Sequence, residues 1–369
     1  MIKSVDNLEW YDPKNGYSDF IKSYFLPIIN NWTSRYIRNI DADIKIIDVN
    51  WTLIPLSFWN RNEGNCYVTS LTWTFKYLQF ETKYIKNAYF RNIVLWISKA
   101  ILKVIEATDL NQIVYVNNLL LSTNLYPELS ADDCAEIKEY LIKTYPSHAI
   151  CFRSLSEFNK KLIDILENDW FKRIVSRQIF VSEKKDLSEY EKRTDVKNDK
   201  KLFENGWFEY EVKEEFTDIE LQEIKDCYDN LYLKKYSLEN PQFSLDFFVN
   251  IARIPLFKMN VLKKDGKIKA AFWYYKIGDT ITTPIFWYTE PDLYRQMSYL
   301  LLLGSLNEAE VLNQSSGVGQ FKMNRWAKKY LEYSLIHYKN LPLIKRVVWV
   351  SIDFIIKNFW EPDLKNNIY

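Results

Sequence analysis

Apolar and polar residues in the first half of the chain show two different periodicities. Apolar residues at helical spacing predict helices, whereas strict alternation predicts strands. Ser130 opens one of the helical segments and is a favoured N-cap residue. The predicted helices cover residues 17–40, 87–110, 130–145 and 155–171. One or two strands are predicted in residues 43–59, a turn-rich bend in 61–70, and further strands in 112–122, 148–156 and 172–182.

The second half begins with helical patterns and continues with alternating ones. Helices are predicted over residues 217–237 and 240–254, the latter opened by Asn240 and Pro241 as cap and first residue. Three alternating runs within 256–289 break at Asp265-Gly266 and Gly278-Asp279, which predicts an antiparallel meander. A helix over 292–313 and strands over 330–338 and 346–352 follow.

The length of the chain, 369 residues, favours two domains. Residues 183–205 are rich in charge and poor in apolar side chains, so they are the best candidate for a junction. We therefore expect an N-terminal domain over 1–190, a charged linker over 191–206 and a C-terminal domain over 207–369. A solvated helix or hairpin arm in place of the linker is the alternative.

Composition excludes several classes of protein. The 49 basic and 48 acidic residues nearly cancel, which argues against a dedicated nucleic-acid binder. The four cysteines are widely spaced and lack the spacing of metal ligands, so no metal site is expected. The polar N-terminus does not resemble a signal peptide, and the apolar runs are too short to span a bilayer. We expect a soluble cytoplasmic protein.

The order of elements in the second half is α–α–β–β–β–α–β–α–β, which is the sequence order of an acyl-CoA N-acyltransferase domain. Residues 240–248, 261–275, 282–284 and 315–342 resemble the C-terminal half of the FemAB-like branch of the GNAT superfamily. Residues 151–155 and 176–180 resemble a matching first half. The resemblance implies a mixed α/β (α+β) fold with two tandem GNAT-like domains, each a mostly antiparallel twisted sheet flanked by helices.

The same resemblance implies an N-acyltransferase. Such an enzyme moves an acyl or aminoacyl group from a thioester donor, acyl-CoA or acyl carrier protein, to the amine of a small molecule or peptide, as in a biosynthetic pathway. No covalently bound cofactor is expected. Transfer from a charged tRNA is one alternative, and a non-catalytic GNAT-like binding module is another. The pyrophosphate-binding pattern of GNAT enzymes contains glycine, whereas residues 287–299 contain none, which puts ordinary coenzyme A binding in doubt.

The stretch from Ser315 to Trp326 contains two glycines and two basic residues. Its spacing matches neither a P-loop nor a dinucleotide fingerprint. It predicts a strand–turn–helix elbow that places Lys322 and Arg325 on one helical face. An anion site formed by Ser316, Gly317, Lys322 and Arg325, assisted by Arg295, is one interpretation; a structural turn with solvated basic residues is the other.

Acylation of an amine requires a base for the ammonium and an acid for the leaving thiolate. Glu332, Tyr333 and His337 on a late strand are the candidates. Alternation places Glu332 and Tyr333 on opposite faces of this strand. A cross-strand salt bridge is the alternative role for Glu332, and a structural role is the alternative for His337.

Arg153, Arg177 and Gln178 are polar residues inside apolar β-rich runs. They are candidates for binding substrate or donor, because a charge in such a run must reach an edge or meet an anion. An interdomain salt bridge is the alternative. Thr283 and Tyr288 belong to the third strand of the meander, which Pro284 interrupts, and they are donor-binding candidates at a splay between strands.

Overall fold

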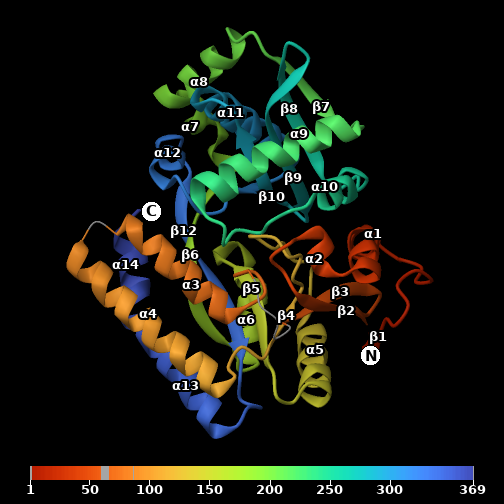
Figure 1. Ribbon diagram of the computed structural model, residues 1–369, viewed down its shortest axis with the longest axis vertical. Coiled ribbons are helices and arrows are strands. Elements are labelled where there is room, and N and C mark those ends of the chain that lie inside the picture. The colour runs from red at the N-terminus through yellow and green to blue at the C-terminus, as the bar shows by residue number, and fades with distance from the viewer. Residues whose placement is uncertain (1, 60–65, 86, 369) are drawn as a thin grey trace. The chain divides into compact units, whose positions relative to one another are not determined.

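The computed structural model describes residues 2–59, 66–85 and 87–368 (Figure 1). These residues form two compact units. Unit 1 comprises Met1–Arg177, Glu239–Pro241 and Leu331–Asn367. Unit 2 comprises Gln178–Leu238, Gln242–Tyr330 and Ile368–Tyr369. The bend predicted over 61–70 lies partly outside the described residues.

Unit 1 is a mixed sheet with helices on both faces. Its strands follow the order β1-β2-β3-β4-β5-β12, and β4 is parallel to β5. The strands are β1 (Lys3–Ser4), β2 (Ala42–Val49), β3 (Thr52–Trp59), β4 (Ile113–Val116), β5 (Ala149–Leu155) and β12 (Lys328–His337). The helices are α1 (Gly16–Asn31), α2 (Thr33–Tyr36), α3 (Leu71–Glu81), η1 (Thr82–Tyr84), α4 (Ala88–Thr108), α5 (Ala131–Thr144), η2 (Glu157–Asn159), α6 (Lys160–Asn168), α13 (Leu343–Ile355), η5 (Ile356–Trp360) and α14 (Glu361–Asn366).

Successive side chains of the central strands of unit 1 point to opposite faces of the sheet and pack into two apolar cores. Val114, Ile150 and Leu335 face one side, where they pack with α5 and α6. Ile113 and Ile336 face the other side, where they pack with α3, α4 and α13. The predicted strand period therefore gives a sheet covered on both faces.

Unit 2 contains the predicted meander. Its strands follow the order β6-β11-β10-β9-β8-β7. Strands β10 and β11 are parallel, and the pairs β6–β11, β9–β10, β8–β9 and β7–β8 are antiparallel. The strands are β6 (Lys172–Glu183), β7 (Glu209–Lys213), β8 (Lys258–Lys264), β9 (Lys267–Ile277), β10 (Thr280–Tyr288) and β11 (Val311–Asn313). The helices are η3 (Lys184–Asp186), α7 (Leu187–Lys192), α8 (Thr194–Glu204), α9 (Asp218–Tyr228), η4 (Asp229–Tyr236), α10 (Leu245–Ala252), α11 (Pro291–Glu308) and α12 (Gly319–Asn324).

Helices also cover both faces of the sheet in unit 2. Phe272 packs into a core built around α11, whereas the next residue, Trp273, faces away from that core and meets Phe248 of α10 with ring centroids 5.5 Å apart. Asp265 and Gly266 have positive φ angles of 52° and 70° at the β8–β9 turn, as a tight two-residue hairpin requires. The meander prediction is confirmed.

Each unit receives a strand from the other half of the chain. Strand β6 follows β5 and α6 in sequence, yet its end pairs with β11, with Glu183 opposite Val311. Strand β12 follows β11 and α12, yet it pairs with β5, with His337 opposite Ile150. The two units thus repeat one arrangement, in which antiparallel strands lead through a helix to a parallel strand flanked by an antiparallel one. The predicted mixed α/β fold, with mostly antiparallel sheets flanked by helices in two units, is confirmed.

Because β12 pairs with β5, the C-terminal part of the chain belongs to a different unit from the one that the predicted domain boundaries gave it. Residues 331–367 belong to the first unit, although the sequence predicted one domain over 207–369. Residues 191–206, predicted as a linker, contain the end of α7 and all of α8. The alternative interpretation, a helix in place of the linker, describes this segment.

Several predicted elements differ from the observed ones, three of them as follows. Residues 346–352 were predicted as a strand and lie in helix α13, because Val348, Trp349, Ile352 and Ile355 recur at helical spacing against one core. The helix predicted from Asn240 begins at Leu245, where the Ser244 side chain caps it. The strand predicted over 112–122 ends at Val116, because Asn117 and Leu120 have positive φ.

Candidate functional site

The parallel strand pairs create a seam in each unit. In unit 1, β4 and β5 pair from Ile113 and Ala149 to Val116 and Phe152 and then part. The next residue of β5 is Arg153, which is 9% exposed. Its Nη1 donates to the carbonyl oxygen of Leu121 at 3.0 Å and to Oδ1 of Asn118 at 3.2 Å. Arg153 therefore fills the seam of unit 1 and holds the buried loop that follows β4.

Arg177 of β6 lies beside Arg153, since both donate to the carbonyl oxygen of Ser122, at 2.8 and 3.2 Å. Nε and Nη2 of Arg177 also bind the two carboxylate oxygens of Glu332 at 2.8 and 3.0 Å. Burial alone would lower the pKa of Arg177, but the adjacent Glu332 carboxylate outweighs this effect and raises the pKa. The sequence-predicted residues Arg153, Arg177 and Glu332 thus meet in one cluster.

Three further residues belong to this polar cluster, and sequence reasoning missed them. The rings of Tyr67 and Tyr77 lie 4.7 Å apart, and Tyr77 of α3 hydrogen-bonds Glu81 one turn later. Burial raises the pKa of Glu81, and the nearby Arg177 guanidinium opposes this shift. Burial also raises the pKa of both tyrosines. The i, i+4 spacing of Tyr77 and Glu81 was the available signal in the sequence.

Tyr333 and His337 lie on the face of β12 opposite to Glu332, as the alternation of side chains predicted, and they have different neighbours. The half-buried Tyr333 ring lies 5.2 Å from the Arg173 guanidinium, and burial raises the pKa of its hydroxyl. The buried His337 ring lies 5.4 Å from Phe171. Burial lowers the pKa of His337, and nearby Lys138 adds to this effect. The structure therefore separates Tyr333 and His337 from the cluster around Glu332.

The seam of unit 2 is different, because β10 has a bulge where the strands part. Strands β10 and β11 pair from Thr280 to Thr282 only. The register of β10 against β9 shifts between Thr282 and Ile285, around Pro284. The Thr283 hydroxyl donates to the carbonyl oxygens of Trp273 at 2.7 Å and Ile285 at 3.1 Å, which fixes the bulge. Pairing between β10 and β11 thus ends where the sequence predicted a splay, and a donor-binding role for Thr283 and Tyr288 stays a prediction.

Aromatic side chains gather around the last residues of β10. The Tyr294 ring of α11 lies 5.0 Å from the Tyr288 ring and 4.6 Å from the Phe321 ring. The Tyr232 hydroxyl donates to the carbonyl oxygen of Phe286 at 2.9 Å. Tyr232 belongs to η4, a π-helical segment of a kind that is frequent at functional sites. Burial raises the pKa of Tyr294, and neighbouring Tyr232 adds to the shift.

The glycine-containing elbow has the predicted strand–turn–helix form. Gly317 has φ of 81°, a conformation that glycine adopts without strain. The Lys322 ammonium group donates to the carbonyl oxygens of Gln314 at 2.7 Å and Ser316 at 2.9 Å. These bonds favour the structural-turn interpretation of the elbow, and a donor-binding role for Ser316, Gly317 and Lys322 stays a prediction.

Arg325 and Arg295 share one carboxylate. Asp199 of α8 is buried and accepts from Nε of Arg325 at 2.5 Å and from Nε of Arg295 at 2.8 Å. The Arg325 guanidinium also lies 3.4 Å from the centroid of the Phe321 ring. The two arginines therefore anchor α8 to α11 and α12, and a donor-binding role for them stays a prediction.

Neither helix α5, which follows β4, nor helix α11, which follows β10, offers a phosphate site at its start. Helix α5 of unit 1 begins with a capping box in which Asp133 binds the backbone N–H and the hydroxyl of Ser130. Helix α11 of unit 2 begins with Glu290 and Pro291, followed by Asp292. A phosphate needs exposed N–H groups and no competing carboxylate. The doubt about ordinary coenzyme A binding therefore extends to both units.

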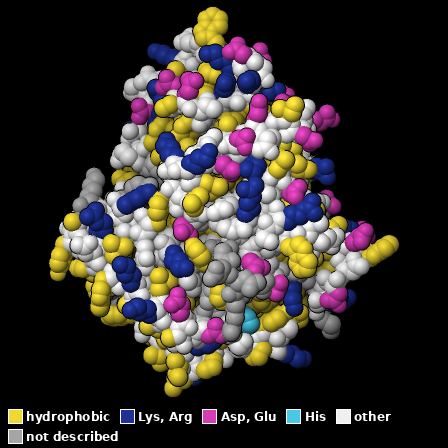
Figure 2. Space-filling view, viewed as in Figure 1, with side chains coloured by type: hydrophobic (Ala, Val, Ile, Leu, Met, Phe, Trp, Pro, Cys, Tyr) yellow, Lys and Arg dark blue, Asp and Glu magenta, His cyan; other side chains and the backbone are white. Residues whose placement is uncertain are grey.

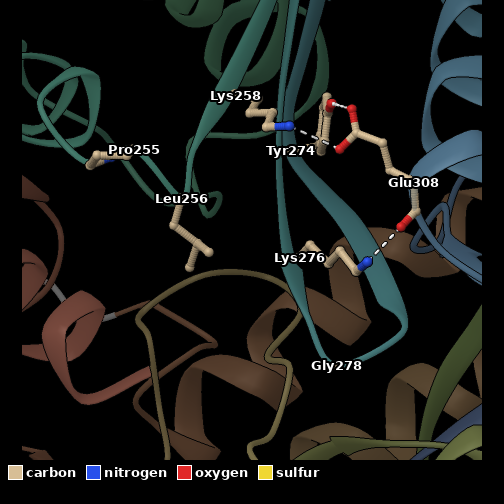
Figure 3. A pocket seen from close by; sticks show the side chains of 7 residues that line it. All are labelled: Pro255, Leu256, Lys258, Tyr274, Lys276, Gly278 and Glu308. Carbon is tan, nitrogen blue, oxygen red and sulfur yellow. Dashed lines mark hydrogen bonds and ion pairs between the residues drawn. The ribbon is translucent and has the colours of Figure 1, made fainter. Parts of the chain in front are cut away.

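A separate pocket of 350 Å³ lies in unit 2 (Figure 3). Glu308 is one of its lining residues, and its carboxylate accepts from Lys258 and from the Tyr274 hydroxyl, each at 3.0 Å. Lys276 donates to the backbone oxygen of Glu308 at 2.5 Å. The sequence-predicted residues do not line this pocket. Its polar groups satisfy one another, so it is no candidate for the catalytic centre.

Two further findings concern the described residues as a group. They contain no cluster of histidine, cysteine or carboxylate residues able to hold a metal ion, and their four cysteines form no disulfide. No helix in this part of the chain combines the length and apolar character needed to cross a bilayer. Gln178, the remaining sequence-predicted residue, is buried on β6.

Several solved structures are similar to this chain, each at low identity. The C-terminal domain of a putative lysylphosphatidylglycerol synthetase from Agrobacterium fabrum is 13% identical, with a TM-score of 0.44 over 61% of this chain and 77% of that one. FemX is 9% identical, with a TM-score of 0.47 over 59% and 78%. A tandem GNAT protein from the clavulanic acid biosynthesis pathway is 6% identical, with a TM-score of 0.37 over 85% and 87%. No family model and no curated protein sequence matches the chain.

Proposed function

We propose that the protein transfers an acyl group to the amine of a small molecule or peptide, and that the seam of unit 2 holds the acyl group. The observation that supports this proposal is the bulge at Thr283–Pro284, where β10 parts from β11. Beyond Thr282, one edge of β10 runs without pairing to β11. Backbone N–H groups along such an edge can polarise a carbonyl group, as an oxyanion site does.

The aromatic residues beside this edge suit an apolar acyl chain. Tyr232, Tyr288, Tyr294 and Phe321 come from three helices and one strand, and aromatic rings of this kind commonly line ligand pockets. In unit 1, the Arg153 side chain occupies the corresponding seam. The proposal therefore assigns the donor to unit 2 alone.

Transfer from a thioester joins the amine nitrogen to the carbonyl carbon as the carbon–sulfur bond breaks. The amine loses its proton to a base, for which Glu332, Tyr333 and His337 stay predictions. Both carboxylate oxygens of Glu332 are engaged by Arg177, which favours the salt-bridge alternative for Glu332. A phenol is protonated at neutral pH, and Tyr294 lies among the aromatic residues beside this edge, so it is the candidate acid that protonates the leaving thiolate.

The acidic helix starts favour a donor that needs no pyrophosphate cradle. An acyl carrier protein thioester meets this condition, and so does an aminoacyl-tRNA ester. The same acidic starts support the second candidate, a non-catalytic GNAT-like module that binds a peptide or a carrier protein. A cytoplasmic location stays part of the proposal.

Mass spectrometry of reactions with acyl-CoA, acyl carrier protein thioesters and aminoacyl-tRNA tests the function. We expect transfer to an amine from one donor class, with Tyr294→Phe lowering kcat by roughly a hundredfold or more. Tyr274→Phe is the matched control, because Tyr274 is a buried tyrosine of unit 2 whose pKa burial also raises, but which faces Glu308. Donor binding without turnover would instead support the binding module. If the protein showed no donor binding and no turnover, both candidates would be excluded.

A further inference from the structure

Two neighbouring helices of unit 1 expose an unusual amount of apolar surface. On α13, Leu343, Val347, Val350 and Phe354 recur every three or four residues and are 66%, 56%, 56% and 63% exposed. On α4, Tyr89, Trp96 and Val104 are also exposed. We call these seven residues, together with Ile344 and Phe359, the outer helix face. Many large apolar side chains exposed on neighbouring helices indicate an interaction site.

The outer helix face is one layer, because both helices bury their opposite sides in the same core. Ile101 and Ile105 of α4 pack in one cluster with Trp349 and Ile352 of α13. The two helices contact each other directly, as Figure 1 shows. Their exposed stripes must therefore point away from this shared core, on the outer side of the helix pair. In Figure 2 apolar side chains appear along the edge of the molecule where α4 and α13 lie.

The charges on this layer are mostly positive. Lys99 and Lys103 of α4 are exposed, as are Arg346 of α13 and Lys357 of η5. The exposed acidic residue on these three elements is Glu106; Asp353 is half-buried and pairs with Lys357 at 2.8 Å. The whole chain has a net charge of only +1, so the positive charge here is a local feature.

We propose that the outer helix face docks the protein on an anionic lipid surface. An amphipathic surface with Trp, Phe and Leu on its apolar side and Lys or Arg around it is the pattern of a helix that lies in a membrane interface. Exposed Trp96 and Tyr89 suit the headgroup region, where such rings concentrate. The lysines and Arg346 would contact anionic headgroups as the apolar side chains enter the acyl boundary.

A second copy of the chain fits this face less well. A two-fold symmetric contact would bring the same patch of each copy together. Lys99, Lys103 and Arg346 would then face a patch of like charge across the apolar centre. Charge thus favours an anionic surface over self-association. This inference is independent of the acyl-transfer proposal, because it uses no residue of either seam.

Flotation of the full chain with lipid vesicles tests the proposal. We expect the protein to float with vesicles of phosphatidylcholine and phosphatidylglycerol, and much less with phosphatidylcholine alone. The double variant Val347→Asp, Val350→Asp should bind roughly tenfold more weakly or worse. The double variant Lys99→Glu, Arg346→Glu should lose the preference for the anionic lipid.

Ile219→Asp provides the matched control, because Ile219 is 75% exposed on α9 of unit 2, and this variant should float like the parent. Circular dichroism and thermal unfolding establish that each variant is folded. Failure of the folded parent to float with anionic vesicles would overturn the proposal. So would a concentration-dependent dimer in analytical ultracentrifugation that the Val347→Asp, Val350→Asp variant abolishes, because the occupant would then be a second copy.

Discussion

Arg177 holds Glu332 through two parallel hydrogen bonds, from Nε to Oε1 at 2.8 Å and from Nη2 to Oε2 at 3.0 Å. Nη2 also donates to the hydroxyl of Thr123 at 3.0 Å. The Glu332 side chain is almost fully buried. A charge pair of this geometry compensates for its own desolvation only while both partners are present.

Removal of one partner should therefore be costly. We expect Glu332→Ala to lower the free energy of unfolding by about 3–5 kcal/mol, because it leaves the Arg177 guanidinium without its counter-charge. Chemical denaturation measures this change. Glu167→Ala is the control, since Glu167 also makes a two-bond pair with an arginine, Arg173, but at the surface. Its loss should cost about 1 kcal/mol or less, and equal losses in both variants would contradict the prediction.

A second buried carboxylate should behave in the same way in unit 2. Asp199 neutralises Arg325 and Arg295, and its side chain is 1% exposed. We expect Asp199→Ala to destabilise the fold by about 3–5 kcal/mol, since the largely buried Arg325 loses its counter-charge. The comparison is Asp292→Ala, which removes an exposed carboxylate 3.8 Å from the same Arg295 and should cost about 0.5 kcal/mol or less. Similar denaturation curves for the two variants would refute this view of Asp199.

Local patterns in the sequence predicted most elements but not their assignment to units. The alternation in residues 256–289 and the Asp265-Gly266 turn define the meander, because both act between neighbouring residues. The exchange of β6 and β12 depends on long-range pairing. Glu183 of β6 lies opposite Val311 of β11, and His337 of β12 lies opposite Ile150 of β5, each far away in sequence. Helix α13 was missed because its Val and Trp residues favour strands locally, and packing against the core overrides that preference.

The candidate site was predictable to a similar extent. A charge inside an apolar strand identified Arg153 and Arg177, since such a charge must find a partner. Their partners come from the loop after β4 and from Glu332 of β12, which only the fold brings together. Glu81 gave little signal, because a carboxylate on a helix is usually solvated and its burial depends on tertiary structure.

His337 should make the protein sensitive to acid. Burial holds its pKa below the ordinary value of about 6.5, so the unfolded chain takes up a proton at higher pH than the folded one. Stability is then complete above about pH 6.5 and decreases as the pH falls below this value. Thermal unfolding at pH 7 and pH 5 should show a smaller loss in His337→Phe than in the parent. Identical losses would mean that His337 does not titrate in this window.

Glu81 should have the opposite effect at neutral pH. Burial raises its pKa in the folded state, so the folded chain binds a proton more tightly than the unfolded chain. Stability therefore falls as the pH rises through the window between the ordinary and the raised pKa, and the deficit persists at pH 7. We expect Glu81→Gln to raise Tm at pH 7, with the gain fading as the pH approaches about 4. Glu128→Gln is the control, because Lys161 lowers the pKa of Glu128, so this variant should bring no such gain. A gain for Glu81→Gln that does not change with pH would show that the buried charge is not its cause.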